Sequence, residues 1–254
     1  MLLHGGGASS ALWTKVAAFL PQRRLIAPDL LGCGETAIVP DLTHDLQAEL
    51  VSEVITATVG GAVDVVGHSY GGATAVRLAI DHAPKVRSLV LIEPILTCLL
   101  REAGDPFYEE SVAVNRFFVA SVDAGKSEEA WRAFLDARNG EGTWARLSDR
   151  RKQDFLVQSP RARETASSNL TNRTTLAECA NLRVPVTIAC GGETTPADRR
   201  TSEVLRDALK GARYEIIPGA GHMSPLSHPQ EIARLIQGSA ERPLIIMGGG
   251  GAQA

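Results

Sequence analysis

Short apolar runs without polar alternation are the feature of this sequence that most restricts its fold. Runs of this kind are typical of strands covered on both faces, as in a parallel sheet, and helix-like segments separate them here. One such segment repeats Leu46, Leu50 and Val54 at helical spacing. The alternation predicts an α/β protein with a mostly parallel sheet and helices on both faces. The strand-like runs are LLH at 2–4, LIAP at 25–28, VDVV at 63–66, SLVLI at 88–92, VPVTIAC at 184–190 and YEIIP at 214–218.

The strand-like pattern is interrupted after Pro94. Residues 97–181 contain amphipathic, helix-like stretches and no convincing strand. We therefore predict a helical cap inserted over 97–181, with 1–96 and 182–254 together forming the core. Eight of the twelve Phe, Trp and Tyr residues lie in this insertion, where they line an apolar substrate pocket or form the core of the cap itself.

Composition and charge limit the partners. The chain has 254 residues, of which 44% are hydrophobic and 22% charged, as in an ordinary globular protein. The net charge is -3 with acids and bases mixed, so we expect no nucleic-acid partner. We see no signal peptide, and the most apolar stretch, LVLIEPILTCLL, is broken by Glu93 and Pro94. We expect a cytoplasmic protein without a membrane partner, and leave homo-oligomerisation open.

The cysteines predict neither a metal nor a redox site. They are widely spaced, and none belongs to a C-x-x-C pair or has a histidine at metal-ligand spacing. We interpret all of them as reduced thiols. The four residues are Cys33, Cys98, Cys179 and Cys190.

The segment GHSYGG at 67–72 is the strongest indication of chemistry. It lies where the run VDVV gives way to the helix-like ATAVRLAI. A G-x-S-x-G pattern at a strand-to-helix turn is typical of a nucleophilic serine on a strained bend, with Gly67 and Gly71 avoiding side-chain collisions around Ser69. A purely structural Gly-Ser-Gly turn is the alternative.

Several motifs in one order resemble those of the α/β-hydrolase superfamily, in the branch with a helical cap. They cover nearly the whole chain. Having serine at position 69, and not aspartate, argues against haloalkane dehalogenase and epoxide hydrolase chemistry, which in the resembling enzymes proceeds through an aspartyl ester. The matching segments are LLHGGGASSALW, LIAPDLLGCGET, VVGHSYGG, SLVLIEP, LRVPVTIACGGETTP and YEIIPGAGHMSPLSHPQEI.

A nucleophilic serine needs a base, and His222 is the best of six histidines. It lies in PGAGHMSP after a strand-like run, at the position that resembles the catalytic histidine of the family. His68 is adjacent to the serine in sequence and cannot easily turn back to it. His44 and His82 lie in helix-like segments and are expected to face solvent.

The resemblance also implies an oxyanion hole. In the family, the donors are the backbone amide after the nucleophile, here Tyr70, and an amide of the loop after HG, here Gly6. A merely flexible HGGG turn is the alternative.

The pattern leaves several candidates for the acid of a Ser-His-acid triad, because the usual aspartate position holds Thr194 or Thr195. Glu93 is the leading candidate. It ends a buried run, where an ionised carboxylate needs a partner, and resembles the alternative placement of dehalogenase-like members. Asp198 and Glu193 remain alternatives, although Thr195-Pro-Ala-Asp198 also reads as a helix start.

Relatives in this superfamily generally have about two further strands before the HG loop, so the first strands of the fold are expected to be missing here. An uncovered sheet edge invites pairing with another molecule. The apolar segment PLIIM at 243–247 is a candidate substitute for a missing strand.

The function expected from these residues and the resemblance is hydrolysis of a small or medium carboxylic ester, or a related acyl compound, through an acyl-enzyme on Ser69. No metal or organic cofactor is required. The alternatives are a C–C bond hydrolase, a lactonase or an acyltransferase of the same fold, and a ligand-binding member without catalysis.

Overall fold

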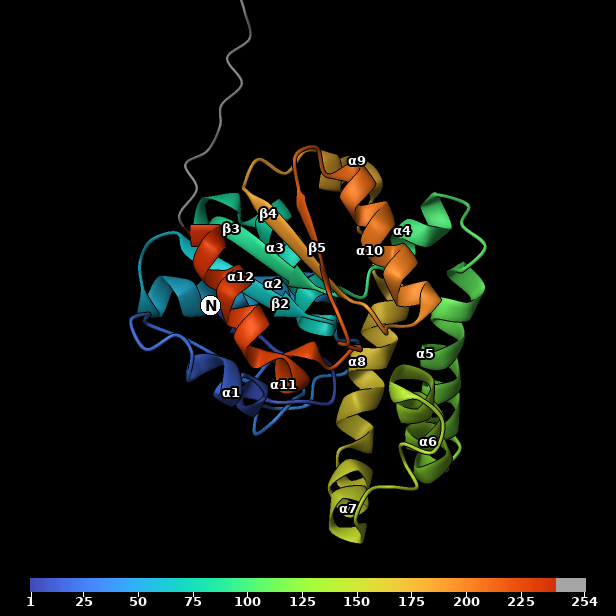
Figure 1. Ribbon diagram of the computed structural model, residues 1–254. Coiled ribbons are helices and arrows are strands. Elements are labelled where there is room, and N and C mark those ends of the chain that lie inside the picture. Colours follow the sequence, from blue (N-terminus) through green and yellow to red (C-terminus); the bar gives the residue numbers. More distant parts are fainter. Residues whose placement is uncertain (241–254) are drawn as a thin grey trace, which may run out of the picture.

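A computed structural model describes residues 1–240 of the chain (Figure 1). Its strands are β1 (Leu2–Leu3), β2 (Val63–His68), β3 (Val86–Ile92), β4 (Val186–Gly191) and β5 (Arg213–Ile217). Its α-helices are α1 (Thr14–Ala17), α2 (His44–Thr58), α3 (Tyr70–Asp81), α4 (Thr97–Glu102), α5 (Tyr108–Asp123), α6 (Ser127–Asn139), α7 (Asp149–Val157), α8 (Ser159–Thr171), α9 (Leu176–Ala180), α10 (Pro196–Ala208), α11 (Ser224–Ser227) and α12 (Pro229–Ala240), with 3-10 turns at Ser10–Trp13 and Ala83–Lys85.

The five strands form one parallel sheet in the order β1-β2-β3-β4-β5. Residue pairs such as Gly67 with Leu91 and Leu91 with Ile188 set the register of the central strands. Because all strands run the same way, the loops after β2, β3, β4 and β5 emerge at one edge of the sheet. Functional groups of α/β proteins gather at this carboxyl edge.

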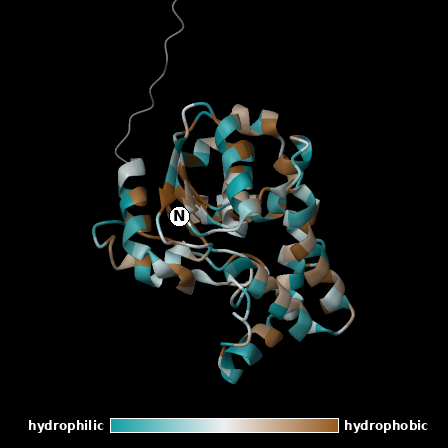
Figure 2. Cartoon of the chain, turned by 45° about the vertical axis from the view of Figure 1, so that its right-hand side comes forward, coloured by the Kyte–Doolittle hydropathy of each residue, from teal (hydrophilic) through white to brown (hydrophobic). Residues whose placement is uncertain are grey.

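Both faces of the sheet are buried, which explains the unbroken apolar runs. Leu3, Val65 and Leu89 pack into a core shared with α2, α3 and α10. Their chain neighbours Leu2, Val66 and Val90 point the other way, into a core shared with α1 and α12. The helices accordingly carry hydrophilic and hydrophobic stretches side by side (Figure 2). The predicted α/β class is confirmed.

The helical insertion between β3 and β4 comprises α4 to α9 and contains no strand. Its outer helices α5 to α8 lie together on one side of the sheet (Figure 1). They share an aromatic core built around Phe118, Trp131 and Trp144. Helices α4 and α9 instead contribute Leu99 and Cys179 to the core beside the sheet. The insertion therefore has its own core and a firm base on the sheet.

The strand predicted at 25–28 is not formed. These residues have no regular structure, although the amide of Leu2 donates to the carbonyl of Ile26 over 2.8 Å. Pro28 has no amide hydrogen, and β1 offers only two residues to pair with, so a ladder cannot extend. The segment nevertheless lies against β1, the first strand of the described sheet. The segment 243–247, considered as a substitute strand, lies outside the described residues.

The turn from β2 into α3 is tight and strained. Ser69 lies at the bend with φ 54° and ψ -116°, a conformation that is rare for residues with a side chain. A β-carbon at Gly67 would lie 2.4 Å from the carbonyl oxygen of Gly71, and one at Gly71 would lie 2.3 Å from that of Leu3. The bend therefore requires glycine at both positions.

His44 begins α2 and is buried, which corrects the prediction that it faces solvent. Its Nδ1 lies 3.1 Å from Oγ1 of Thr74 on α3, and its Nε2 lies 3.2 Å from Oδ1 of Asn169 on α8. The ring also packs against Tyr70, with ring centroids 4.6 Å apart. This histidine joins the sheet-side helices to the insertion. Burial lowers the pKa of His44 to about 4.

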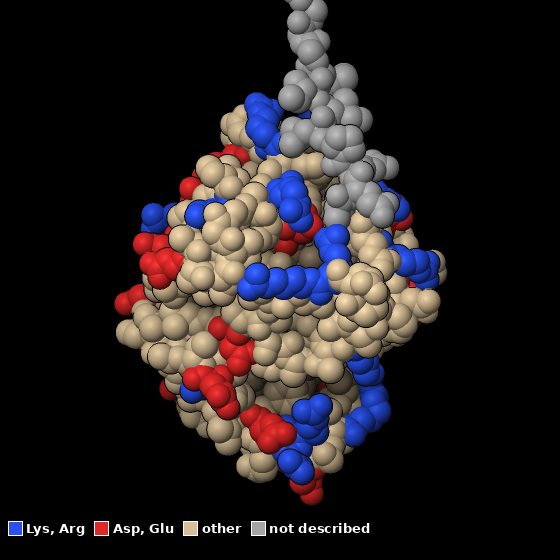
Figure 3. All heavy atoms as spheres, turned by 90° about the vertical axis from the view of Figure 1, so that its left-hand side faces the viewer, with Lys and Arg blue, Asp and Glu red and all other residues tan. Residues whose placement is uncertain are grey.

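Charges are mixed on the surface, as the composition indicated. The face shown in Figure 3 carries interspersed basic and acidic side chains. Among residues 1–240, no helix is long and apolar enough to cross a bilayer.

We predict that Gly67→Ala destabilises the protein by about 1–3 kcal/mol or more, because the added methyl group forces the backbone of the turn to move. Urea unfolding of the variant measures the loss. Gly61→Ala is the matched control, since nothing lies within 4 Å of its added methyl group. Equal unfolding midpoints for Gly67→Ala and wild type would contradict the proposed steric role.

We also predict a pH-dependent contribution of His44 to stability. An unfolded histidine binds a proton below about pH 6.5, whereas the folded protein keeps His44 neutral down to about pH 4. Its contribution to the free energy of unfolding therefore falls as the pH drops through this window, by about 1.4 kcal/mol per pH unit at most. Urea titrations from pH 7 to 4.5 should give a shallower pH slope for His44→Gln than for wild type. Parallel slopes would contradict the prediction.

Candidate functional site

Ser69, His222 and Glu93 lie together at the carboxyl edge of the sheet, although they are far apart in sequence. Nε2 of His222 is 3.1 Å from Oγ of Ser69. Nδ1 of His222 is 2.8 Å from Oε2 of Glu93. All three residues are buried. The structure thus brings together the three residues that the sequence analysis selected.

The backbone of adjacent strands fixes the relative positions of Ser69 and Glu93. The amide of Ser69 donates to the carbonyl of Ile92 over 2.9 Å, and the amide of Glu93 donates to the carbonyl of Ala189 over 3.0 Å. Glu93 also has a positive φ, 43°. Strained backbone at two neighbouring strand ends is typical of a functional site.

The carboxylate of Glu93 is held in its ionised form. Oε1 accepts a hydrogen bond of 2.7 Å from the amide of Gly191, and Oε2 accepts one of 2.7 Å from the hydroxyl of Thr194. Burial raises the pKa of Glu93, but the bonds from His222, Thr194 and Gly191 outweigh this effect and keep the pKa below its usual value. With Oε2 accepting at Nδ1 of His222, Nε2 of the neutral ring is left as the acceptor for the serine proton.

Asp198 is close to His222 but bonded elsewhere. Its Oδ2 is 3.9 Å from Nδ1 of His222, beyond hydrogen-bond range. Asp198 accepts from Arg138 of α6, and its Oδ2 is 2.9 Å from the hydroxyl of Thr195. The amide of Asp198 donates to Thr195 over 3.1 Å, so the expected helix start is present. Burial raises the pKa of Asp198, whereas Arg138 and His222 lower it more strongly.

Glu193, the other alternative acid, has an exposed side chain. Its amide donates to the carbonyl of Ala220 over 2.8 Å and thereby ties the loop after β4 to the loop that carries His222. Glu93 is therefore the carboxylate that the geometry places on the histidine.

His68 supports the histidine loop, a role that the sequence analysis did not identify. Its Nε2 lies 2.8 Å from the carbonyl oxygen of His222 and so donates a hydrogen bond to it. Burial lowers the pKa of His68 to about 3, so the ring stays neutral and its Nε2 proton serves this bond. A histidine next to a nucleophile at a strand end could have suggested such a role.

The predicted oxyanion donors lie beside Ser69. Gly6 and Tyr70 line one pocket with the serine, and a β-carbon at Gly6 would lie 3.6 Å from Cβ of Tyr70. The amide of Tyr70 is in the first turn of α3, where helices leave amides without internal partners. Within residues 1–240, neither amide donates to another protein group. Both are therefore available to a ligand.

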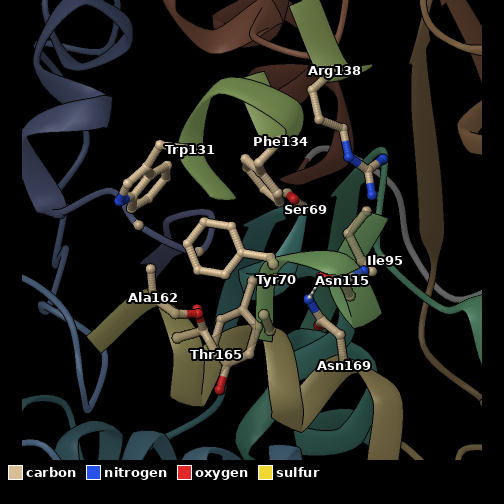
Figure 4. Close-up of a pocket in the computed structure, with 14 residues that line it drawn as sticks. Ser69, Tyr70, Ile95, Asn115, Trp131, Phe134, Arg138, Ala162, Thr165 and Asn169 are labelled. Atoms are coloured by element: carbon tan, nitrogen blue, oxygen red, sulfur yellow. Dashed lines mark hydrogen bonds between the residues drawn. The ribbon is translucent and has the colours of Figure 1, made fainter. Parts of the chain in front are cut away.

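The pocket above Ser69 is narrow, with a volume of about 30 Å³, room for roughly two water molecules. The insertion supplies most of its wall. Figure 4 shows Arg138, Asn115 and Asn169 along one side and Trp131 on the opposite side. Trp131 also belongs to the aromatic core of the insertion, so this residue both lines the pocket and packs in that core.

Among the described residues, one cluster of side chains has a geometry that could hold a metal ion. Ligand atoms of Glu93, Asp198 and His222 lie within 4.8 Å of one another. Each of these side chains already has hydrogen-bonding partners, including Ser69 and Arg138. The cluster is therefore satisfied by the protein's own groups.

Comparison with known proteins identifies the family. Residues 1–235 match the sequence model of the Alpha/beta hydrolase family. The chain is 27% identical to the lipase LipV of Mycobacterium tuberculosis, over 93% of this chain and 91% of that protein. It is 28% identical to a pimeloyl-[acyl-carrier protein] methyl ester esterase of Nitrosomonas europaea, over 91% of each.

A solved structure shows the same fold. It is MGS-M2, an alpha/beta hydrolase enzyme from a Medee basin deep-sea metagenome library, and it superposes with a TM-score of 0.79 at 16% identity, covering 95% of this chain and 88% of that one. Together with the sequence match across the sheet and the insertion, this likeness leads to one conclusion: the chain belongs to the alpha/beta hydrolase family.

Proposed function

We propose that the protein is a serine hydrolase that cleaves a small or medium carboxylic ester, or a related acyl compound, with Ser69, His222 and Glu93 as its catalytic triad. The observation that carries the proposal is the continuous chain of contacts from Glu93 through His222 to Oγ of Ser69, at 2.8 and 3.1 Å. The relatedness to a lipase and a methyl ester esterase supports the same chemistry.

In this mechanism His222 removes the proton of Ser69 as the hydroxyl oxygen attacks the ester carbonyl. The amides of Gly6 and Tyr70 stabilise the negative oxygen of the tetrahedral intermediate. His222 then gives its proton to the leaving alcohol, and an acyl-enzyme remains on the serine. A water molecule, activated by the same imidazole, releases the acid. Glu93 orients the ring and stabilises its protonated form.

We further propose that residues 97–181 act as a cap over a core formed by 1–96 and 182–254. The position of the insertion over Ser69 supports this division. A pocket of about 30 Å³ is smaller than an ester substrate, so the wall contributed by α5, α6 and α8 must move to admit one. A cytoplasmic location is proposed from the four cysteines, which are free and buried in the structure.

We predict that Ser69→Ala lowers kcat for nitrophenyl ester hydrolysis by roughly 10⁴–10⁶, because Ser69 carries the hydroxyl that is hydrogen-bonded to His222. A fluorophosphonate probe should label the wild type and fail to label this variant. Labelling without turnover of any ester would favour an acyltransferase or a C–C bond hydrolase. Absence of labelling in folded wild type would favour a non-catalytic binding protein.

We also predict that Glu93→Gln lowers kcat by about 10²–10⁴, since an amide cannot hold the imidazole in the required tautomer or stabilise its positive charge. Asp198→Asn should keep the rate within about tenfold, because Asp198 does not bond to His222. Thermal unfolding of both variants controls for loss of structure. A collapse of activity in Asp198→Asn alone would show that the acid is misassigned.

A further inference from the structure

A buried amide in the pocket wall has no partner for its hydrogens. Asn115 on α5 is 1% exposed. Its Nδ2 is buried and makes no hydrogen bond within the described chain. Its Oδ1 accepts a hydrogen bond of 3.4 Å from Nδ2 of Asn169. Leaving a buried amide donor unsatisfied costs about 1–3 kcal/mol, so this position calls for an explanation.

A series of hydrogen bonds fixes which atom of Asn115 is left without a partner. The hydroxyl of Thr74 is fully buried, and Nδ1 of His44 is its described partner, so the hydroxyl donates to that nitrogen. His44 therefore carries its proton on Nε2 and donates to Oδ1 of Asn169.

Asn169 in turn presents its NH₂ group to Oδ1 of Asn115. The NH₂ group of Asn115 is then the last group in this series of hydrogen bonds, and it has no partner within the described residues. Thr74, His44 and Asn169 thus leave Asn115, a residue that lines the pocket, with a free hydrogen-bond donor and not a free acceptor.

The charges around the pocket disfavour an anionic substrate. Arg138 is the charged side chain among the pocket's lining residues, and it is paired with Asp198; the two side chains are 8% and 6% exposed. Glu93 is a second carboxylate, and like Asp198 it lies close to His222. With two carboxylates and one guanidinium, a further carboxylate from a substrate would meet net repulsion in a poorly hydrated site.

We propose that Asn115 is a specificity-determining residue whose Nδ2 donates a hydrogen bond to a second, uncharged acceptor on the substrate, such as a ketone, hydroxyl or ether oxygen. The inference rests on the proposed function. It narrows the substrate class to acyl compounds that carry such an oxygen near the scissile carbonyl. The apolar part of the substrate lies against Trp131, across the pocket from Asn115 (Figure 4).

Three nitrophenyl esters of similar length test the proposal: pentanoate, 4-oxopentanoate and the monoester of succinate. Each kcat/KM is divided by the second-order rate constant of the same ester with hydroxide, to remove differences in the reactivity of the carbonyl groups. The wild type should prefer the oxo ester over the plain ester by about 3–10-fold, the effect of one neutral hydrogen bond. The anionic succinate ester should be the poorest substrate.

In Asn115→Leu the ratio of oxo to plain ester should fall to about one, because the donor is gone. Asn115→Asp keeps an oxygen for Asn169 and removes the donor, so it should lose the preference too. Asn181→Leu, an exposed position in the loop after α9, is the matched control and should retain the wild-type ratio. An unchanged ratio in Asn115→Leu, or succinate as the best substrate, would overturn the proposal.

Binding of the same esters to Ser69→Ala, measured by calorimetry, does not depend on turnover. Tighter binding of the oxo ester that is lost in the double variant with Asn115→Leu would support the role of Asn115. Equal affinities for the oxo and plain esters would overturn it. Absence of fluorophosphonate labelling would count against the serine hydrolase itself, so the two failures are distinguishable.

Discussion

The hydrogen bonds that join the ends of β2, β3 and β4 are the constraint on which the site depends. The amide of Ser69 is held by Ile92 and the amide of Glu93 by Ala189, so the serine and the glutamate stand one strand apart in strained conformations. The parallel register therefore sets the distance that His222 must bridge. The pairing of strands across the whole core thereby fixes the positions of the site's side chains to within about an ångström.

Much of this arrangement could be predicted from the sequence because it rests on local patterns. Unbroken apolar runs indicated strands that are buried on two faces, and the glycines around Ser69 indicated a tight bend. Glu93 was recognisable because a carboxylate at the end of a buried run needs a partner. The strand at 25–28 was wrong because its apolar residues resembled a strand, whereas Pro28 and the short β1 do not permit a ladder.

The remaining parts of the site depend on contacts between distant segments. The spacing of apolar residues along the sequence does not predict such contacts. His44 appeared to be a surface residue of a helix start, but α8 of the insertion covers it. His68 contacts the histidine loop 154 residues later. Asn115 and Arg138 lie on amphipathic helices, where polar residues are expected to face water. Their burial results from how the insertion packs over the sheet.

The ion pair between Arg138 and Asp198 links helix α6 of the insertion to a carboxylate that lies close to the imidazole of His222. Lifting α6 would strip Asp198 of its counter-charge while leaving it 3.9 Å from Nδ1 of His222. Separating a buried ion pair is costly, so this pair holds α6 against the core beside the imidazole.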